Sequence, residues 1–343
     1  MHMADALLSP AVGGAMWAAT AVSTAYCSRK IREEMDDRKV PLMGVLGALV
    51  FAAQMINFTI PGTGSSGHLG GGMLLAILLG PCAAFLVMAS VLSVQALFFA
   101  DGGLLALGAN IFNLGVFPCF VAYPLLYRPL AGRDPTPGRM GAAAVLASVV
   151  GLQFGAMGVV FQTVLSGISE LPFTSFLALM LPIHLAIGVV EGLITAAVVT
   201  FVWRAQPDIL NRAAVGRTQP GASMRKVLLG LGAAAAVIAA VVSWFASSHP
   251  DGLEWSIAGV TGTEELEPPE GGVHGVLARL QEKTSLLPDY GFRSAGEGEE
   301  GEAEASWPAV DPGTSVSGVV GGVLTLLVAG AAGWLLRRRA GTA

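Results

Sequence analysis

The chain begins Met1-His2-Met3, and a histidine at position 2 brings three nitrogen atoms within reach of one metal ion. They are the α-amine of Met1, the backbone nitrogen between Met1 and His2, and Nδ1 of the His2 ring. Chelation through them closes a five-membered and then a six-membered ring, and the α-amine releases its proton to a metal at low cost because it titrates near neutrality. Nitrogen donors in a plane suit Ni(II) or Cu(II), and less strictly Co(II). The alternative is that a Met-His start is an accident of sequence. A further donor elsewhere in the chain would support the metal site.

His68 is the candidate for that donor. It lies in residues 61–72, Pro-Gly-Thr-Gly-Ser-Ser-Gly-His-Leu-Gly-Gly-Gly, and half of this segment is glycine. Such a backbone can fold tightly and approach a ligand closely. The first two residues leave one corner of a square plane open, and one imidazole would fill it. The alternative is a flexible polar loop with a solvent-facing histidine.

Ionisable and amide side chains also interrupt the apolar parts of the sequence. His184 and Glu191 are seven residues apart, which places them two turns apart on one face of a helix. Ionisable groups in a membrane usually face the bundle interior, so we expect a second polar site or a structural hydrogen-bonding network there. Gln95, Asn110 and Asn113 are expected first to bond between helices, and alternatively to support metal ligands from behind.

A turn flanked by an aromatic residue is predicted for residues 249–255, His-Pro-Asp-Gly-Leu-Glu-Trp. We favour a structural cap; weak cation binding by His249, Asp251 and Glu254 is the alternative. The pattern G-x-x-x-x-G-K-[ST] is absent from the sequence, so the chain does not hydrolyse ATP by that route. No catalytic residue and no bound cofactor are predicted, because His184 and Glu191 alone supply no nucleophile for a hydrolase.

The composition predicts a polytopic membrane protein. The 343 residues are 53% hydrophobic and 13% charged, and the mean hydropathy is +0.66, which is too apolar for a soluble domain. The cysteines show no CxxC spacing, so neither a disulfide framework nor a zinc site is indicated. The absence of a basic amphipathic face argues against a nucleic-acid partner. The start has no basic leader and no A-x-A-like cleavage site, so we expect no removable signal peptide. A bulky histidine at position 2 disfavours removal of the first methionine, so we expect Met1 to be retained.

Charge predicts the topology of the apolar runs, which cover residues 6–28, 41–60, 72–99, 104–127, 140–165, 174–203, 227–247 and 316–336. Lys/Arg clusters at 29–39, 128–139, 204–226 and 337–339 mark the cytoplasmic side. An even number of crossings must then separate neighbouring clusters, yet three runs lie between the first two.

Gly80-Pro81 resolves this conflict, because this helix-breaking pair divides 72–99 into a short segment 72–80 and a full helix 82–99. The short segment would span only about 13 Å and be buried among its neighbours. We therefore predict nine segments in the cytoplasmic (inner) membrane, with the N-terminus outside and the C-terminus inside. A single tilted helix over 72–99 is the alternative and would put one basic cluster outside.

The predicted fold class is an all-α polytopic membrane protein with two modules. The first module, residues 1–205, is a compact bundle of seven segments. A basic cytoplasmic linker, 206–225, leads to the second module, 226–343. There two membrane segments, 227–247 and 316–336, flank an acidic extracytoplasmic insert, 248–315. Its low-complexity part, 297–304, is expected to be disordered.

Several separated motifs resemble the CbiM/NikM family, the substrate-binding membrane components of energy-coupling factor (ECF) transporters for cobalt and nickel. They are the first ten residues, the segment around His68, Leu-Gly-Pro-Cys at 79–82, residues 95–113, and His184 to Gly192. Met3 stands where the family typically has Ile. Residues 249–255 are similar to the PDGLE-type module of nickel-transport accessory proteins. The whole chain resembles a NikM-type component fused to a NikN-type accessory subunit.

The resemblance implies a metal bound by the amine of Met1, the backbone nitrogen and Nδ1 of His2, and His68. It also implies two cytoplasmic ATPase subunits and a transmembrane coupling (T) protein as partners. The expected function is ATP-driven import of Ni(II) or Co(II), with Ni(II) favoured because affinity rises from Co(II) to Ni(II). The alternative is a membrane metal sensor or assembly scaffold that binds metal without transporting it.

Overall fold

The computed structural model describes residues 2–31, 39–132, 134–205, 224–269, 271–293 and 307–340. Met1, most of the predicted linker and the acidic segment 297–304 lie outside the described residues. Helices dominate what is described: α1 Pro10–Ile31, α2 Lys39–Gln54, α3 Gly72–Leu79, α4 Pro81–Val94, α5 Leu107–Ile111, α6 Arg128–Ala131, α7 Pro137–Ser166, α8 Phe173–Ala205, α10 Met224–Ala240, α11 Gly252–Thr261, α12 Gly272–Thr284 and α13 Pro312–Ala340. The π-helical turns Gln95–Phe99 and Phe112–Tyr127 extend α4 and join α5 to α6.

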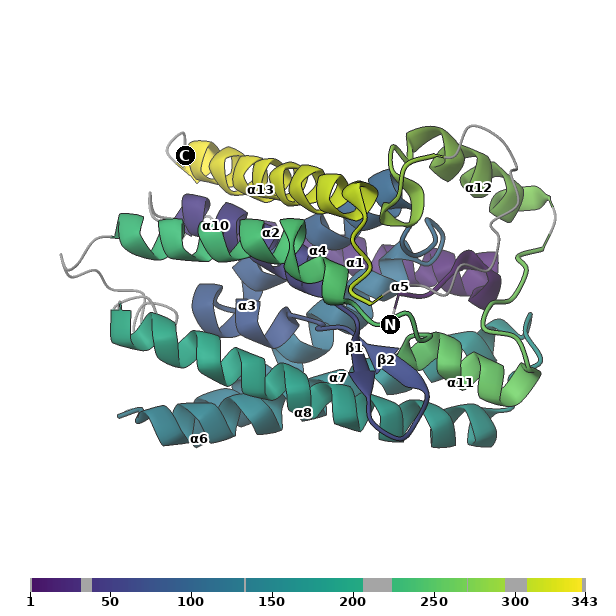
Figure 1. The fold of residues 1–343 in the computed structure, drawn as a ribbon, viewed down its shortest axis with the longest axis horizontal. Helices are drawn as coiled ribbons and strands as arrows, with labels where there is room; N and C mark the ends of the chain where they lie inside the picture. Colours follow the sequence, from purple (N-terminus) through teal and green to yellow (C-terminus); the bar gives the residue numbers. More distant parts are fainter. Residues whose placement is uncertain are drawn as a thin grey trace.

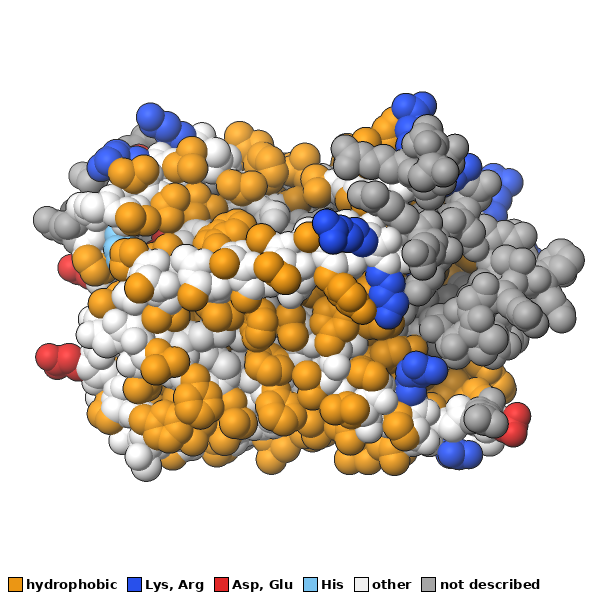
Figure 2. Space-filling view, turned by 180° about the vertical axis from the view of Figure 1, so that it is seen from behind, with side chains coloured by type: hydrophobic (Ala, Val, Ile, Leu, Met, Phe, Trp, Pro, Cys, Tyr) orange, Lys and Arg blue, Asp and Glu red, His pale blue; other side chains and the backbone are white. Residues whose placement is uncertain are grey.

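The described helices make the chain an all-α polytopic membrane protein, as the composition predicts. Among the described residues five helical stretches are long and apolar enough to cross a membrane: Pro81–Phe99, Leu107–Ala131, Pro137–Ser166, Phe173–Ala205 and Pro312–Arg338. Helix α2 is apolar but shorter. Figure 2 shows a broad band of hydrophobic side chains across the helices, with most of the visible charged side chains towards the two ends. Such a band suits the hydrocarbon core of a bilayer.

The predicted break at Gly80-Pro81 is present. Helix α3 ends at Leu79, Gly80 takes a positive φ of 80°, and Pro81 opens α4. Glycine tolerates that backbone conformation, and proline fits a first helical position because its missing N–H has no partner there. All eight residues of α3 are buried. A helix this short spans about 12 Å, and its ends are tolerated within the bundle because protein surrounds them.

Two predicted membrane segments are shorter as helices than expected. The run 41–60 is helical only to Gln54, and Phe58–Ile60 (β1) pairs antiparallel with Ser65–Gly67 (β2). Gly62 and Gly64 have positive φ and make the turn between these strands. The run 227–247 is α-helical only to Ala240 and continues as a short 3₁₀ turn. The polar insert is partly ordered, since it contains α11 and α12.

The second module packs along the first. Helix α13 lies against α2, where small residues allow close approach: a Cβ on Gly44 would lie 2.9 Å from the carbonyl oxygen of Leu326, and one on Gly321 would overlap Phe51. In Figure 1 the end of α8, the start of α10 and the end of α13 lie at one end of the bundle, and α11 and α12 lie towards the other. The insert therefore covers the end of the bundle opposite these basic helix ends.

Candidate metal centre

The N-terminal segment is fixed in the bundle by its backbone. The N–H of Met3 donates to Oδ1 of Asn110 at 2.8 Å, and Nδ2 of Asn110 donates to the Met3 carbonyl at 3.2 Å. The N–H of Gly103 donates to the same carbonyl at 3.0 Å. No side chain fits at Gly103, because a Cβ there would lie 1.8 Å from Oδ1 of Asp5. The segment is thus held on both sides immediately after His2.

The rings of His2 and His68 are stacked, with centroids 4.9 Å apart and planes inclined by 22°. Both side chains are 8% exposed. Nδ1 of His2 lies 2.8 Å from Oδ1 of Asp101, while its Nε2 is buried and has no hydrogen-bond partner. The structure therefore brings together the two histidines singled out in the sequence, and it places the predicted chelating nitrogen of His2 against a carboxylate.

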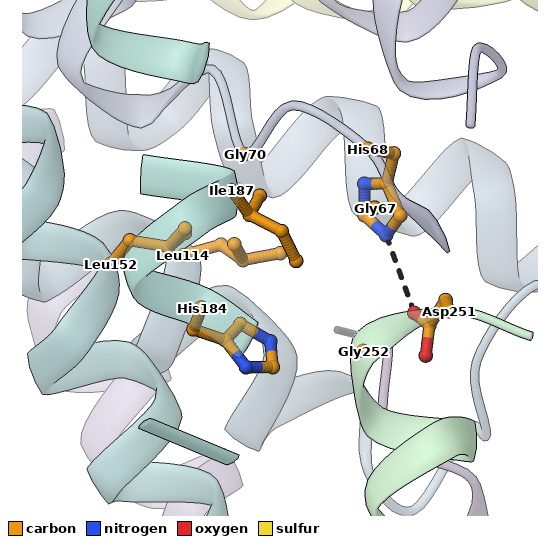
Figure 3. Close-up of a pocket in the computed structure, with 9 residues that line it drawn as sticks. All are labelled: Gly67, His68, Gly70, Leu114, Leu152, His184, Ile187, Asp251 and Gly252. Atoms are coloured by element: carbon orange, nitrogen blue, oxygen red, sulfur yellow. Dashed lines mark ion pairs between the residues drawn. The ribbon is translucent and has the colours of Figure 1, made fainter. Parts of the chain in front are cut away.

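His68 presents its other nitrogen towards a second carboxylate. Its Nδ1 lies 3.1 Å from the carbonyl oxygen of Leu69, a contact in which the ring nitrogen donates. In the neutral ring this bond leaves the lone pair on Nε2, the usual arrangement of a metal-binding histidine. Nε2 lies 3.7 Å from Oδ2 of Asp251, which comes from the second module (Figure 3).

Glu191 holds the glycine-rich loop in place. Its Oε2 accepts the N–H of Gly70 at 2.8 Å and its Oε1 accepts that of Gly71 at 3.2 Å. Nε2 of Gln54 donates to the Gly70 carbonyl at 2.8 Å, and Nε2 of Gln95 donates to Oε1 of Gln54 at 2.9 Å. Glu191 and the two glutamines thus anchor the backbone that carries His68.

His184 does not pair with Glu191. Its Nδ1 lies 2.8 Å from the Met180 carbonyl one turn earlier, and its Nε2 is buried without a hydrogen-bond partner. Figure 3 shows His184 lining the same small pocket as His68 and Asp251. His184 and Glu191 therefore form neither a shared polar site nor a hydrogen-bonded pair. Glu191 holds the glycine-rich loop, and His184 faces the pocket beside His68.

The amide side chains of Asn110 and Asn113 also have different partners. Asn113 and Gln162 exchange a pair of hydrogen bonds, Nδ2 to Oε1 at 2.8 Å and Nε2 to Oδ1 at 2.9 Å, which ties two helices together. Asn110 instead bonds to the backbone of Met3. Asn113 therefore bonds between helices and also donates to the sulfur of Met3 at 3.9 Å, whereas Asn110 bonds to the backbone of Met3.

Two carboxylates at the site remain charged despite their burial. Burial raises the pKa of Asp101, but the charge and hydrogen bond of His2 and the hydrogen bond from Tyr290 outweigh it, so the pKa lies well below the usual range. The pKa of Asp251 is also lowered, because the positive charge of the N-terminal amine is the largest influence that opposes its burial. For His68, burial is the largest influence and lowers the pKa, which favours the neutral, metal-binding ring.

Sequence reasoning did not single out Asp101 or Tyr290. The Tyr290 hydroxyl donates to Oδ2 of Asp101 at 2.5 Å, so a residue of the insert touches the carboxylate that pairs with His2. The only signal for Asp101 was its place in the motif between Gln95 and Asn110. Within the described residues no three His, Cys, Asp or Glu side chains form a group that could hold a metal ion.

The fold and the site define a multi-pass membrane protein with a buried histidine pair at one end of its bundle. The family of cobalt uptake substrate-specific transmembrane regions, CbiM, matches residues 2–209, and the PDGLE domain matches residues 225–338. The chain belongs to the CbiM family and carries a PDGLE domain fused to it. It is a component of metal transport.

Relatives support both parts of this assignment. A protein of Archaeoglobus fulgidus, provisionally assigned as the fused nickel transport protein NikMN, is 34% identical, with both chains fully covered. The cobalt transport protein CbiM of Sorangium cellulosum is 34% identical over 65% of this chain and all of its own. The crystal structure of a transition metal transporter is 29% identical and superposes with a TM-score of 0.54 over 63% of this chain and 98% of its own.

Proposed function

We propose that this protein captures Ni(II), or Co(II), outside the cell and is the substrate-binding component of an ATP-driven ECF importer. The observation that carries the proposal is the stacked pair of His2 and His68 beside an N-terminal segment anchored through Met3. The relatives are named as nickel and cobalt transport proteins, which supports the choice of ion.

The proposed donor set is the α-amine of Met1, the backbone nitrogen and Nδ1 of His2, and Nε2 of His68. Nδ1 of His2 is the nitrogen that lies against Asp101, at 2.8 Å. Binding therefore exchanges the Asp101 carboxylate for the metal at that nitrogen. His68 keeps its Nδ1 bond to the Leu69 carbonyl, and the proposed donor Nε2 is the nitrogen that lies 3.7 Å from Oδ2 of Asp251.

Nickel is favoured over cobalt by two arguments. Affinity for a given nitrogen site rises from Co(II) to Ni(II), and a plane of four nitrogens is a preferred geometry of Ni(II). The fused relative assigned to nickel transport also aligns with the whole of this chain, including its PDGLE domain. Cu(II) satisfies the same geometry, so a competition experiment with all three ions is the direct measure of preference.

ATP hydrolysis must come from partner subunits, because the phosphate-binding pattern is absent from this sequence. We propose two cytoplasmic ATPases and a transmembrane coupling protein in the inner membrane. The basic ends of α8, α10 and α13 would then face the cytoplasm. This orientation puts His2 and His68 on the outer side of the membrane. The proposed domains are the metal-binding bundle of residues 1–205, the linker 206–225 and the accessory module 226–343.

The proposal is tested by blocking the α-amine of the full chain in detergent. One variant places four residues, Met-Lys-Leu-Ser, before Met1, and a second preparation carries an acetylated N-terminus. Both should bind Ni(II) at least about 100-fold more weakly than the free chain, since losing a direct ligand costs more than losing an outer hydrogen-bond partner. The same four residues after Ala343 are the control. Unchanged Ni(II) affinity in both blocked forms would sink the chelate.

The second candidate is a sensor or scaffold that binds metal without moving it. Uptake of ⁶³Ni by cells that make this chain with and without ATPase partners separates the two. Partner-dependent accumulation supports import, and binding without accumulation supports the sensor.

A further inference from the structure

Helix α12 is anchored to the bundle through one of its faces. Nε2 of His274 donates to the carbonyl of Leu8, just before α1, at 2.9 Å. Nε2 of Gln281 donates to the carbonyls of Ala96 at 2.9 Å and Gly102 at 2.7 Å, at the end of the apolar stretch that contains α4. His274 and Gln281 are seven residues apart, so they lie two turns apart on the same face. This face holds α12 at the level where the α4 stretch ends.

The residues that follow α12 contact the bundle at the same level. The N–H of Leu286 donates to the carbonyl of Phe98 at 2.9 Å. A Cβ on Gly313 would lie 3.2 Å from the backbone nitrogen of Phe292, so Phe292 packs on the first turn of α13. In Figure 1 α12 lies beyond the start of α13, at the end of the bundle opposite the basic helix ends. Helix α12 therefore lies at the boundary where two apolar helices leave the hydrophobic band.

Another face of α12 is apolar and exposed. Val273, Val276 and Leu280 are 47%, 56% and 47% exposed, and their spacing of three and four residues aligns them in one stripe. Two further apolar side chains that follow the helix, Leu286 and Phe292, are also exposed. Single exposed apolar side chains are normal on a protein surface, but a row of them on one face indicates an interaction site. We call Val273, Val276 and Leu280 the α12 stripe.

Charge distinguishes α12 from the rest of the insert. Residues 248–315 contain 14 Asp and Glu residues but only three Lys and Arg residues. Two of these three, Arg279 and Lys283, are exposed on α12, which has one acidic residue, Glu282. Arg279 and Lys283 each lie three positions after a residue of the α12 stripe, so they flank it. An exposed apolar stripe flanked by Lys and Arg is typical of a helix that lies in a membrane interface.

The neighbouring surface indicates that lipid covers the α12 stripe. Helix α13 is long and apolar enough to cross a membrane, and it exposes Val316, Val319 and Val323. Because Phe292 packs on the first turn of α13, the exposed apolar residues after α12 lie at one end of this lipid-facing surface. The long stems of Lys and Arg also let their charged groups reach water and phosphate while neighbouring apolar side chains contact acyl chains.

We propose that α12 is an interfacial helix whose stripe enters the boundary between headgroups and acyl chains of the bilayer. This boundary is the one at the end of the bundle that carries His2 and His68. Arg279 and Lys283 contact the lipid phosphate groups, and the bilayer thereby holds the insert against this end of the bundle. The inference does not depend on metal binding, and only the choice of the outer leaflet follows from the proposed orientation.

The test uses the full chain reconstituted in vesicles of phosphatidylcholine and phosphatidylglycerol. A nitroxide label is attached to Val276→Cys or to Leu280→Cys. Glu282→Cys is the matched control, because Glu282 is exposed on the same helix but outside the stripe, and Val323→Cys is the lipid-facing reference on α13. The native cysteines are buried, and the unmodified chain measures any label that they take up. Electron paramagnetic resonance compares relaxation by oxygen, which dissolves in lipid, with relaxation by chromium oxalate, which stays in water.

We expect both stripe labels to lose relaxation by chromium oxalate and to be relaxed by oxygen, as the Val323→Cys label is, whereas the Glu282→Cys label shows the reverse. Val273→Cys replaces any stripe variant whose thermal unfolding differs from that of the unmodified chain. Stripe labels that chromium oxalate relaxes as strongly as the Glu282→Cys label overturn the proposal. So does protection that appears only after partner subunits are added, which assigns the stripe to a protein interface. Spin–spin broadening between labels assigns it to a second copy of the chain and overturns the proposal as well.

Discussion

The imidazole rings of His2 and His68 lie in contact, 4.9 Å apart between centroids, although 66 residues separate them in sequence. Neither segment could hold its histidine there alone. Asn110 fixes the backbone after His2, and Glu191 fixes the loop after His68. The pair is therefore a product of helices α5 and α8 as much as of the two histidines.

Replacing His68 with alanine should lower Ni(II) affinity by at least about 10-fold, because it removes one of four proposed donors. His249→Ala is the matched control, since His249 is exposed and reaches Ser66 only through its backbone carbonyl. Isothermal titration calorimetry on both variants is the measurement. Equal affinities for His68→Ala and the unmodified chain would show that His68 is only a loop residue.

Replacing Glu191 should disturb the loop rather than a ligand. Glu191→Ala leaves the N–H groups of Gly70 and Gly71 buried without acceptors, at a cost of about 1–3 kcal/mol each. We expect a lower unfolding temperature and weaker Ni(II) binding. Glu191→Gln keeps an acceptor oxygen, so its unfolding temperature and Ni(II) affinity should lie between those of Glu191→Ala and the unmodified chain. Stability and affinity that both stay unchanged in Glu191→Ala would contradict the anchoring role.

Replacing Asn110 should mainly affect Ni(II) binding, whereas replacing Asn113 should mainly affect thermal stability. Asn110→Ala releases the backbone of Met3 and should weaken Ni(II) binding by about 10-fold, the lower range for a residue that supports a ligand. Asn113→Ala breaks the exchange with Gln162 and leaves a buried amide, so it should mainly lower the thermal stability. Ni(II) affinity and thermal stability should be measured for both variants. Equal changes of both quantities in the two variants would contradict the separate roles of Asn110 and Asn113.

Tyr290 should contribute to the attachment of the insert. Tyr290→Phe removes only the hydroxyl that donates to Asp101, and a hydrogen bond to a charged group is worth about 1.5–3 kcal/mol. We expect a lower midpoint of thermal unfolding. Tyr26→Phe is the control, because Tyr26 is 54% exposed on α1. A midpoint that drops equally in both variants, or in neither, argues against a stabilising contact to Asp101.

Local sequence pattern predicts most of the helices. A bilayer requires long apolar segments with satisfied backbone groups, so composition and run length indicate α4, α7, α8 and α13 directly. Gly80-Pro81 marks a break that depends only on the residues themselves. Hydropathy fails at the end of α2, because Phe58 and Ile60 continue the apolar run but lie in a strand. A hydropathy window does not distinguish a short apolar strand from the end of a helix.

The residues of the site divide along the same line. The type and position of His2, and the glycine content around His68, belong to the sequence, because chelate ring size and backbone freedom are local properties. The partners of these residues do not. Asp101 and Asp251 reach the two histidines, and Glu191 reaches Gly70, only through packing between segments about 100 residues or more apart. Such contacts depend on how helices pack and on where the second module docks, so the tertiary structure alone decided them.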